Sequence, residues 1–175
     1  ETQNLAEVAD KIRRSKTFDQ ATSCSTENAC LVKKDIYNDF IKAMEAEGGY
    51  LVTTDEKPKL QATMWVDGHL NANIVAQPAA KIAGMAGIDL PEGKTFMMVD
   101  EIGIGADYPF SGEKLSVVAT IYQWTEFNEA IEMGRNRFNE EEDIVDIESG
   151  IGNFARASER IVIELNSISS ELSEA

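Results

Sequence analysis

The 175-residue sequence has few of the side chains on which metal and disulfide chemistry depend: two cysteines and one histidine. The cysteines, Cys24 and Cys30, are too few for a disulfide framework. With no second pair, their spacing does not match a usual zinc site. We therefore expect no bound metal and a reducing compartment, for which the cytoplasm is the default.

Basic residues are scarce as well. The chain has 16 lysines and arginines against 31 aspartates and glutamates, a formal net charge of -15. A surface of that sign repels nucleic acid and anionic lipid, so we expect neither as a partner. No apolar run approaches the roughly 20 residues of a membrane-spanning helix, and no signal-peptide layout opens the chain.

The remaining composition is that of a globular domain. Hydrophobic residues make up 43% of the chain and charged residues 27%, so a core can form without disulfides or metals. The chain begins with Glu1 rather than Met, in a segment that leads into a helix. We therefore expect it to be a piece of a longer protein.

Helical and strand patterns alternate along the chain. Apolar spacing and end signals predict helices over residues 4–15, 36–44, 58–65, 78–86 and 125–134. Short apolar runs predict strands at residues 31–32, 50–52, 70–75, 95–99 and 117–122, and glycines predict a loop over residues 103–112. This alternation predicts an α/β fold with a mostly parallel sheet flanked by helices.

The C-terminal part differs from the rest. Residues 139–175 carry ten acidic side chains and only Arg156 and Arg160 as basic ones. Their apolar residues fit a helix face and a strand equally well, so periodicity leaves the two alternatives open. We treat residues 135–175 as an acidic, divergent segment distinct from residues 1–134.

Each of the two cysteines lies in a different local context. Cys24 lies in a hydroxyl-rich loop before an apolar strand, where hydroxyls and backbone N–H groups could stabilise a thiolate. A lone cysteine is also commonly a small core residue, so the local sequence does not decide its role. Cys30 precedes Leu31 and Val32, which indicates a core position.

Two further polar residues stand out. His69 lies in a predicted turn and is expected to be a solvated surface group. Glu113 stands between a loop and the strongest predicted strand, where a carboxylate could accept hydrogen bonds from a ribose diol or could simply be a surface charge.

Two motifs give these residues a common interpretation. Residues 16–28 read Lys-Thr-Phe-Asp-Gln-Ala-Thr-Ser-Cys-Ser-Thr-Glu-Asn, and residues 109–116 read Pro-Phe-Ser-Gly-Glu-Lys-Leu-Ser. In this order, and with Lys34-Asp35-Ile36-Tyr37 as the next helix start, they resemble the motifs of CoA-acylating aldehyde dehydrogenases. The resemblance covers residues 1–134. It is nearest to the sulfoacetaldehyde and succinate-semialdehyde type and to the dehydrogenase half of aldehyde–alcohol dehydrogenases.

The resemblance implies a catalytic domain in which Cys24 is the nucleophile and Glu113 holds the nicotinamide ribose. A small aldehyde would add to the thiolate, and hydride would leave to NAD or NADP. The resulting thioester on Cys24 would pass its acyl group to CoA. The backbone N–H of Cys24 is a candidate donor to the oxyanion. The resemblance also implies a homo-oligomer in the full-length form.

Three departures qualify this interpretation. The dinucleotide-binding domain that precedes the cysteine motif in the family is missing from these residues. A later Gly-His-Ser/Thr segment has its nearest match in Gly150-Ile151-Gly152-Asn153, with asparagine in place of histidine. The acidic end does not resemble the family's closing strands. We therefore predict a catalytic domain that is inactive alone, with two alternatives: a non-catalytic binding or assembly domain that retains the fold, and an unrelated α/β domain.

Overall fold

The computed structural model describes residues 4–140, and the chain divides into two units, residues 1–140 and 141–175. In the first unit the helices are α1 (Leu5–Phe18), α2 (Tyr37–Ala46), α3 (Lys57–Met64), α4 (Ala79–Ala86) and α5 (Phe127–Glu140). The strands are β1 (Ala29–Lys33), β2 (Gly49–Leu51), β3 (Trp65–Val66), β4 (His69–Leu70), β5 (Phe96–Asp100) and β6 (Val118–Trp124). Short 3-10 helices lie at Lys34–Ile36, Ala72–Ile74 and Pro109–Ser111.

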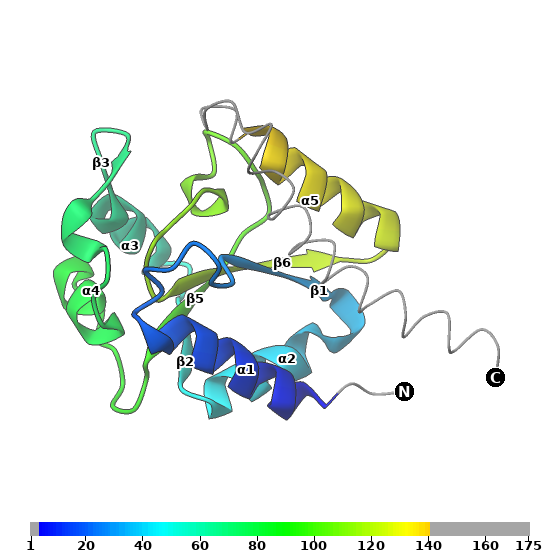
Figure 1. The fold of residues 1–175 in the computed structure, drawn as a ribbon, viewed down its shortest axis with the longest axis horizontal. Coiled ribbons are helices and arrows are strands. Elements are labelled where there is room, and N and C mark those ends of the chain that lie inside the picture. The colour runs from blue at the N-terminus through cyan, green and yellow to red at the C-terminus, as the bar shows by residue number, and fades with distance from the viewer. Residues whose placement is uncertain (1–3, 141–175) are drawn as a thin grey trace. The chain divides into compact units, whose positions relative to one another are not determined.

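Four strands form a parallel sheet in the order β1-β6-β5-β2. β3 and β4 pair separately as a two-stranded antiparallel hairpin. Figure 1 shows α1 and α2 together below the strands and α5 above them. The predicted α/β fold with a mostly parallel sheet is confirmed.

The core lies around the two central strands. Residues 96–99 of β5 and 118–121 of β6 have no exposed surface. Strands in the middle of a parallel sheet are covered on both faces, which is why these two read as continuous apolar runs. Helices contribute further core residues to the same cluster: Ala9, Phe40, Met44, Leu60, Met64, Ile82 and Ala83.

Two predicted helix ends can be compared with the structure. α1 begins after Asn4, whose side chain accepts a 3.4 Å hydrogen bond from the Glu7 N–H. It ends three residues after the predicted end at Ser15. Lys16 is buried against the sheet, and this tertiary contact stabilises the additional turn. α4 ends at Gly87 as predicted, with a φ of 64° that suits glycine.

Two other local predictions are wrong. Residues 70–75 do not form one strand: β4 stops at Leu70, and the Asn71 side chain accepts a 3.0 Å hydrogen bond from the Asn73 N–H to start a 3-10 turn. An asparagine side chain that bonds its own backbone competes with strand pairing. Gly134 does not end α5, which runs on to Glu140, since an interior glycine costs a helix only about 1 kcal/mol.

The open choice between helix and strand beyond residue 140 lies outside the described residues, and so does the segment Gly150-Ile151-Gly152-Asn153. Within the part of the chain that the structure describes, no helix has the length and apolar character needed to cross a membrane.

Candidate functional site at the amino edge of the sheet

The topology brings Cys24 and Glu113 to the same edge of the sheet. Cys24 lies in the loop that leads into β1, and Glu113 lies in the loop that leads into β6. β1 and β6 are parallel neighbours, with Ala29 opposite Thr120. The amino ends of these two strands are therefore adjacent, and the loops that precede them meet there.

The cysteine loop is a tight, polar turn at the end of α1. Gln20 and Ala21 both have a φ of 57°, which redirects the chain after the helix. The Asp19 carboxylate accepts a 3.0 Å hydrogen bond from the Ser23 N–H, and the Asp19 carbonyl accepts one of 2.7 Å from the Thr22 hydroxyl. These contacts hold a compact turn directly before Cys24.

Cys24 itself is exposed at the surface of that turn. Its neighbours Ser23 and Ser25 share a 2.8 Å hydrogen bond between their hydroxyls. Among the described residues, no hydrogen bond engages the backbone N–H of Cys24. A thiol in this position can meet a substrate, and the N–H beside it can donate to a developing oxyanion.

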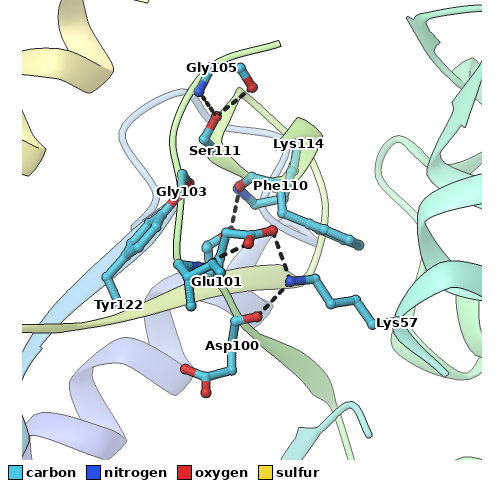
Figure 2. Close-up of polar contacts among 11 residues, drawn as sticks. Lys57, Asp100, Glu101, Gly103, Gly105, Phe110, Ser111, Lys114 and Tyr122 are labelled. Atoms are coloured by element: carbon cyan, nitrogen blue, oxygen red, sulfur yellow. Dashed lines mark hydrogen bonds and ion pairs between the residues drawn. The ribbon is translucent and has the colours of Figure 1, made fainter. Parts of the chain in front are cut away.

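The loop that carries Glu113 runs from the end of β5 to the start of β6 and is held at several points (Figure 2). The Tyr122 hydroxyl donates a 3.1 Å hydrogen bond to the Gly103 carbonyl. The Gly105 N–H donates to the Ser111 hydroxyl at 3.0 Å. These two hydrogen bonds fix the conformation of the long loop between β5 and β6. They thereby help to fix the position of Glu113 near the end of that loop.

Close to Glu113 the loop is held by buried groups. The Thr120 hydroxyl donates a 2.6 Å hydrogen bond to the Phe110 carbonyl. Lys114 is fully buried, and its ammonium donates to the carbonyls of Phe110 at 2.7 Å and Gly112 at 3.0 Å. Glu113 remains exposed between these anchored neighbours, so its carboxylate is available to a ligand.

The two loops are tied to each other. The Asn28 side chain donates a 2.9 Å hydrogen bond to the Gly112 carbonyl, directly beside Glu113. The Lys16 ammonium donates to the carbonyls of Ser116 at 2.9 Å and Val118 at 3.3 Å. Local sequence gave no reason to single out Lys16, Asn28 or Lys114. The only signal was that all three lie inside the two motifs.

The other residues considered from the sequence lie elsewhere. Cys30 is half-buried on β1 and packs against the core. His69 is exposed on β4, and no hydrogen bond or ion pair in the described part of the chain joins it to Cys24. The structure therefore offers His69 no role as a base for Cys24. Within residues 4–140 there is no group of three or more acidic, histidine or cysteine side chains arranged to hold a metal.

The carboxyl edge of the sheet carries a second polar cluster. Lys57 pairs with the Glu101 carboxylate at 2.9 Å, and Glu101 is only 5% exposed. The same ammonium donates to the Asp100 carbonyl at 2.8 Å, as Figure 2 shows, and lies 5.9 Å from the centre of the Phe110 ring. This cluster anchors the first residues of the loop that ends at Glu113.

Tyr37 and Asp100 share that edge. Burial, followed by the nearby Asp100 carboxylate, raises the pKa of Tyr37 to about 12. Desolvation also raises the pKa of Asp100, against the lowering effect of its hydrogen bonds with Tyr37 and Gln123. Each of these groups has a partner within the protein.

Two hollows of about 450 Å³ each lie on the described surface, and neither is lined by Cys24 or Glu113. One lies over Arg13, Glu47 and Lys94, and the other over Lys57, Pro58 and Trp65. Both hollows therefore lie away from Cys24 and Glu113 at the amino edge.

Comparison with known proteins identifies the relatives of this arrangement. No protein-family model matches the chain. The acylating sulfoacetaldehyde dehydrogenase of Cupriavidus necator is 46% identical over 130 residues, which are 73% of this chain and 26% of that protein. The bifunctional aldehyde-alcohol dehydrogenase of Escherichia coli is 33% identical over 132 residues, 75% of this chain and 15% of that protein.

A solved structure gives the same result. An acetylating aldehyde dehydrogenase from Geobacillus thermoglucosidasius matches with a TM-score of 0.77 and 35% identity, over 80% of this chain and 31% of that one. The chain therefore spans about a third or less of the length of these relatives. It is homologous to one part of the CoA-acylating aldehyde dehydrogenases, as its two motifs predicted.

Proposed function

We propose that this chain is the catalytic-cysteine part of an NAD- or NADP-dependent CoA-acylating aldehyde dehydrogenase and that it is inactive by itself. The observation that carries the proposal is the tied pair of loops at the amino edge. One loop presents an exposed thiol at Cys24, and the other presents an exposed carboxylate at Glu113.

In this proposal Cys24 performs the covalent chemistry. Its thiolate forms a bond to the carbonyl carbon of a small aldehyde and leaves an oxyanion, to which the Cys24 N–H donates. Loss of hydride from that adduct leaves a thioester on Cys24. The thiol of CoA then takes the acyl group and releases the Cys24 thiolate. A nucleophilic thiol must remain reduced, which agrees with a cytoplasmic protein.

Among the described residues, Glu113 is the group that suits a nicotinamide cofactor. The exposed carboxylate of Glu113 can accept hydrogen bonds from a ribose diol. When bound, the cofactor supplies the hydride acceptor. Cys24 and Glu113 line neither of the two hollows described above, and we expect the remaining walls of the site to come from a dinucleotide-binding domain outside residues 4–140.

A direct test uses the 175-residue chain with a thiol alkylating agent near neutral pH, with each cysteine followed by peptide mass spectrometry. We expect Cys24 to react at least about tenfold faster than Cys30, because the reagent reaches an exposed thiol more easily than a half-buried one. Cys24→Ala and Cys30→Ala variants serve as matched controls. Equal and slow reaction of both thiols would contradict the proposal.

Turnover is tested in a chimera in which residues 4–134 replace the matching part of the Cupriavidus necator relative. With an aldehyde, CoA and NAD or NADP, we expect reduced cofactor and acyl-CoA to form. Cys24→Ala should lower kcat by a factor on the order of 10³ or more, because it removes the nucleophile, whereas Cys30→Ala should retain activity. A folded chimera in which Cys24→Ala is as active as its parent would instead favour a binding or assembly domain.

The 175-residue chain without a partner gives the complementary result. Mixed with NAD, CoA and a short aldehyde, it should produce no reduced cofactor. Sustained production by this chain alone would show that no further domain is needed and would overturn the partial-domain part of the proposal.

A further inference from the structure

Two side chains of the first motif reach across to the second. We call residues 16–28 the cysteine segment and residues 112–118 the glutamate segment. Lys16 and Asn28, the first and last residues of the cysteine segment, both hydrogen-bond to carbonyls of the glutamate segment. The proposed reaction gives neither residue a role, because neither carries the reacting thiol or the ribose-binding carboxylate.

Lys16 makes the first connection. It lies in α1, is 2% exposed, and donates to the Ser116 and Val118 carbonyls at 2.9 and 3.3 Å. Removing an ammonium from water costs several kcal/mol, and an apolar side chain of similar volume often fills such a place at equal or better stability. A lysine is therefore not needed to fill this space. Its ammonium instead fixes the two carbonyls of the glutamate segment, those of Ser116 and Val118, against α1.

Asn28 makes the second connection from the opposite end. Its side-chain amide donates to the Gly112 carbonyl at 2.9 Å, and its backbone carbonyl accepts from the Thr120 N–H at 3.1 Å. The backbone bond belongs to the β1–β6 pairing, so it holds Asn28 in register with β6. The side-chain bond adds a contact just beyond the end of the sheet, to Gly112, the residue before Glu113.

The two connections bracket both functional positions. Along the cysteine segment, Lys16 precedes Cys24 and Asn28 follows it. Along the glutamate segment, the carbonyl held by Asn28 precedes Glu113, and those held by Lys16 follow it. Rotation or sliding of either segment would break at least one of these bonds, so the pair fixes the placement of Glu113 relative to Cys24.

We propose that Lys16 and Asn28 are positioning residues that set the placement of the Glu113 carboxylate against the Cys24 thiol. The tether itself follows from the contacts described, whereas its effect on catalysis rests on the function proposed above. The two parts are therefore tested separately.

The tether is tested by hydrogen exchange on the 175-residue chain. Asn28→Asp keeps the shape of the side chain but replaces the donor with a carboxylate that repels the Gly112 carbonyl. We expect exchange of the amides in residues 112–118 to accelerate about tenfold, because loss of this half-buried hydrogen bond favours local opening. Amides of β5 (Phe96–Asp100) should stay protected. Asn38→Asp, on the exposed face of α2, makes the same charge change and is the matched control.

Lys16→Met should produce the same acceleration in residues 112–118, with Lys11→Met on the exposed face of α1 as its control. If the Lys16→Met variant does not fold, the Asn28→Asp variant still tests whether the tether exists. Exchange that is unchanged in the glutamate segment, or altered only next to the substituted residue, would overturn the tether.

The catalytic part is tested by a double-mutant cycle in the chimera. We expect Glu113→Gln and Asn28→Asp each to raise the KM for the nicotinamide cofactor about tenfold, and the double variant to resemble Glu113→Gln alone, because residues that act through one group are not additive. Multiplying effects would indicate a merely structural role and overturn the positioning proposal. A Glu113→Gln variant with an unchanged KM would refute the cofactor role of Glu113 itself, and the exchange result would stand independently.

Discussion

The amino and carboxyl edges of the four-stranded sheet both carry polar residues, but those residues are satisfied in different ways. At the carboxyl edge, polar groups pair with one another: the Lys57 ammonium with the Glu101 carboxylate, and the neutral Tyr37 hydroxyl with the Asp100 carboxylate. At the amino edge, Cys24 and Glu113 are exposed, while the loops that carry them are held by hydrogen bonds from Lys16 and Asn28.

This difference separates polar residues that stabilise from polar residues that can react. A group already paired within the protein has little left to offer a ligand, whereas an exposed group on an anchored loop does. Ligands of open parallel sheets usually bind beyond the carboxyl ends of the strands. The site proposed above lies instead at the amino edge, where Cys24 and Glu113 are exposed and, among residues 4–140, make no side-chain hydrogen bond or ion pair.

The largest expected effect on stability comes from removing the Lys57–Glu101 ion pair at the carboxyl edge. Lys57→Met leaves the Glu101 carboxylate, 4% exposed in its side chain, without its cation and should lower the free energy of unfolding by about 2–4 kcal/mol. Urea denaturation measures the change. Lys33→Met breaks the exposed pair with Asp35 and should cost less than about 1 kcal/mol.

The rate of Cys24 alkylation in folded Lys57→Met should stay at the wild-type value, since the ion pair lies at the other edge. Adding Glu101→Leu should recover part of the stability, because no unpaired charge is then buried. A Lys57→Met chain as stable as the wild type would show that Glu101 finds another partner and would remove the contrast between the two edges.

A smaller effect is expected from Tyr37 at high pH. Its pKa rises from 10.0 in the unfolded chain to about 12 in the folded protein. The folded state therefore holds this proton more tightly, so the associated stability is present below pH 10 and is lost as the pH rises to about 12. After allowance for the partial exposure of the ring, we expect the loss to be roughly 1 kcal/mol.

Tyr37→Phe isolates that contribution at high pH, because it removes the titrating hydroxyl and keeps the ring in place. The difference in unfolding free energy between wild type and variant, measured by denaturation across this pH range, should shrink as the pH increases. A difference that stays constant with pH would mean that the Tyr37 hydroxyl is not protected by the fold.

The smallest effect concerns the backbone of the cysteine loop at the amino edge. Gln20 has a φ of 57°, in the left-handed region that asparagine tolerates better than glutamine. We expect Gln20→Asn to raise the free energy of unfolding by about 0.5 kcal/mol, measured by thermal denaturation.

Ala21→Gly provides the comparison at the next residue. It relieves the same strain at a φ of 57°, but Ala21 is only 3% exposed, so lost packing and a more flexible unfolded chain should leave its net effect near zero. Destabilisation by Gln20→Asn would show that the glutamine side chain holds the turn before Cys24.

Strongly patterned elements could be predicted from the sequence. The apolar run of β6 and the proline and glycine at the two ends of α4 gave correct positions, because central strands and capped helices have local signals. Prediction failed where one side chain or one tertiary contact overrode the pattern. Asn71 ended the supposed strand at residues 70–75, and the burial of Lys16 prolonged α1.

For the candidate site, the sequence supplied the identity of Cys24 and Glu113 through two motifs, but not the relation between them. Residue order cannot state that two loops are neighbours, since this depends on which strands pair. The functions of both residues stay predictions until the alkylation and chimera experiments are done.

The sequence by itself thus determined the α/β class, the central strands and the family to which the chain is related, because periodicity and motifs are local properties. Only the tertiary structure decided that β1 and β6 are neighbours, and hence that the two motifs meet at one edge. It also decided that Lys16 and Asn28 join the motifs, because hydrogen bonds between residues far apart in the chain exist only after the sheet has formed.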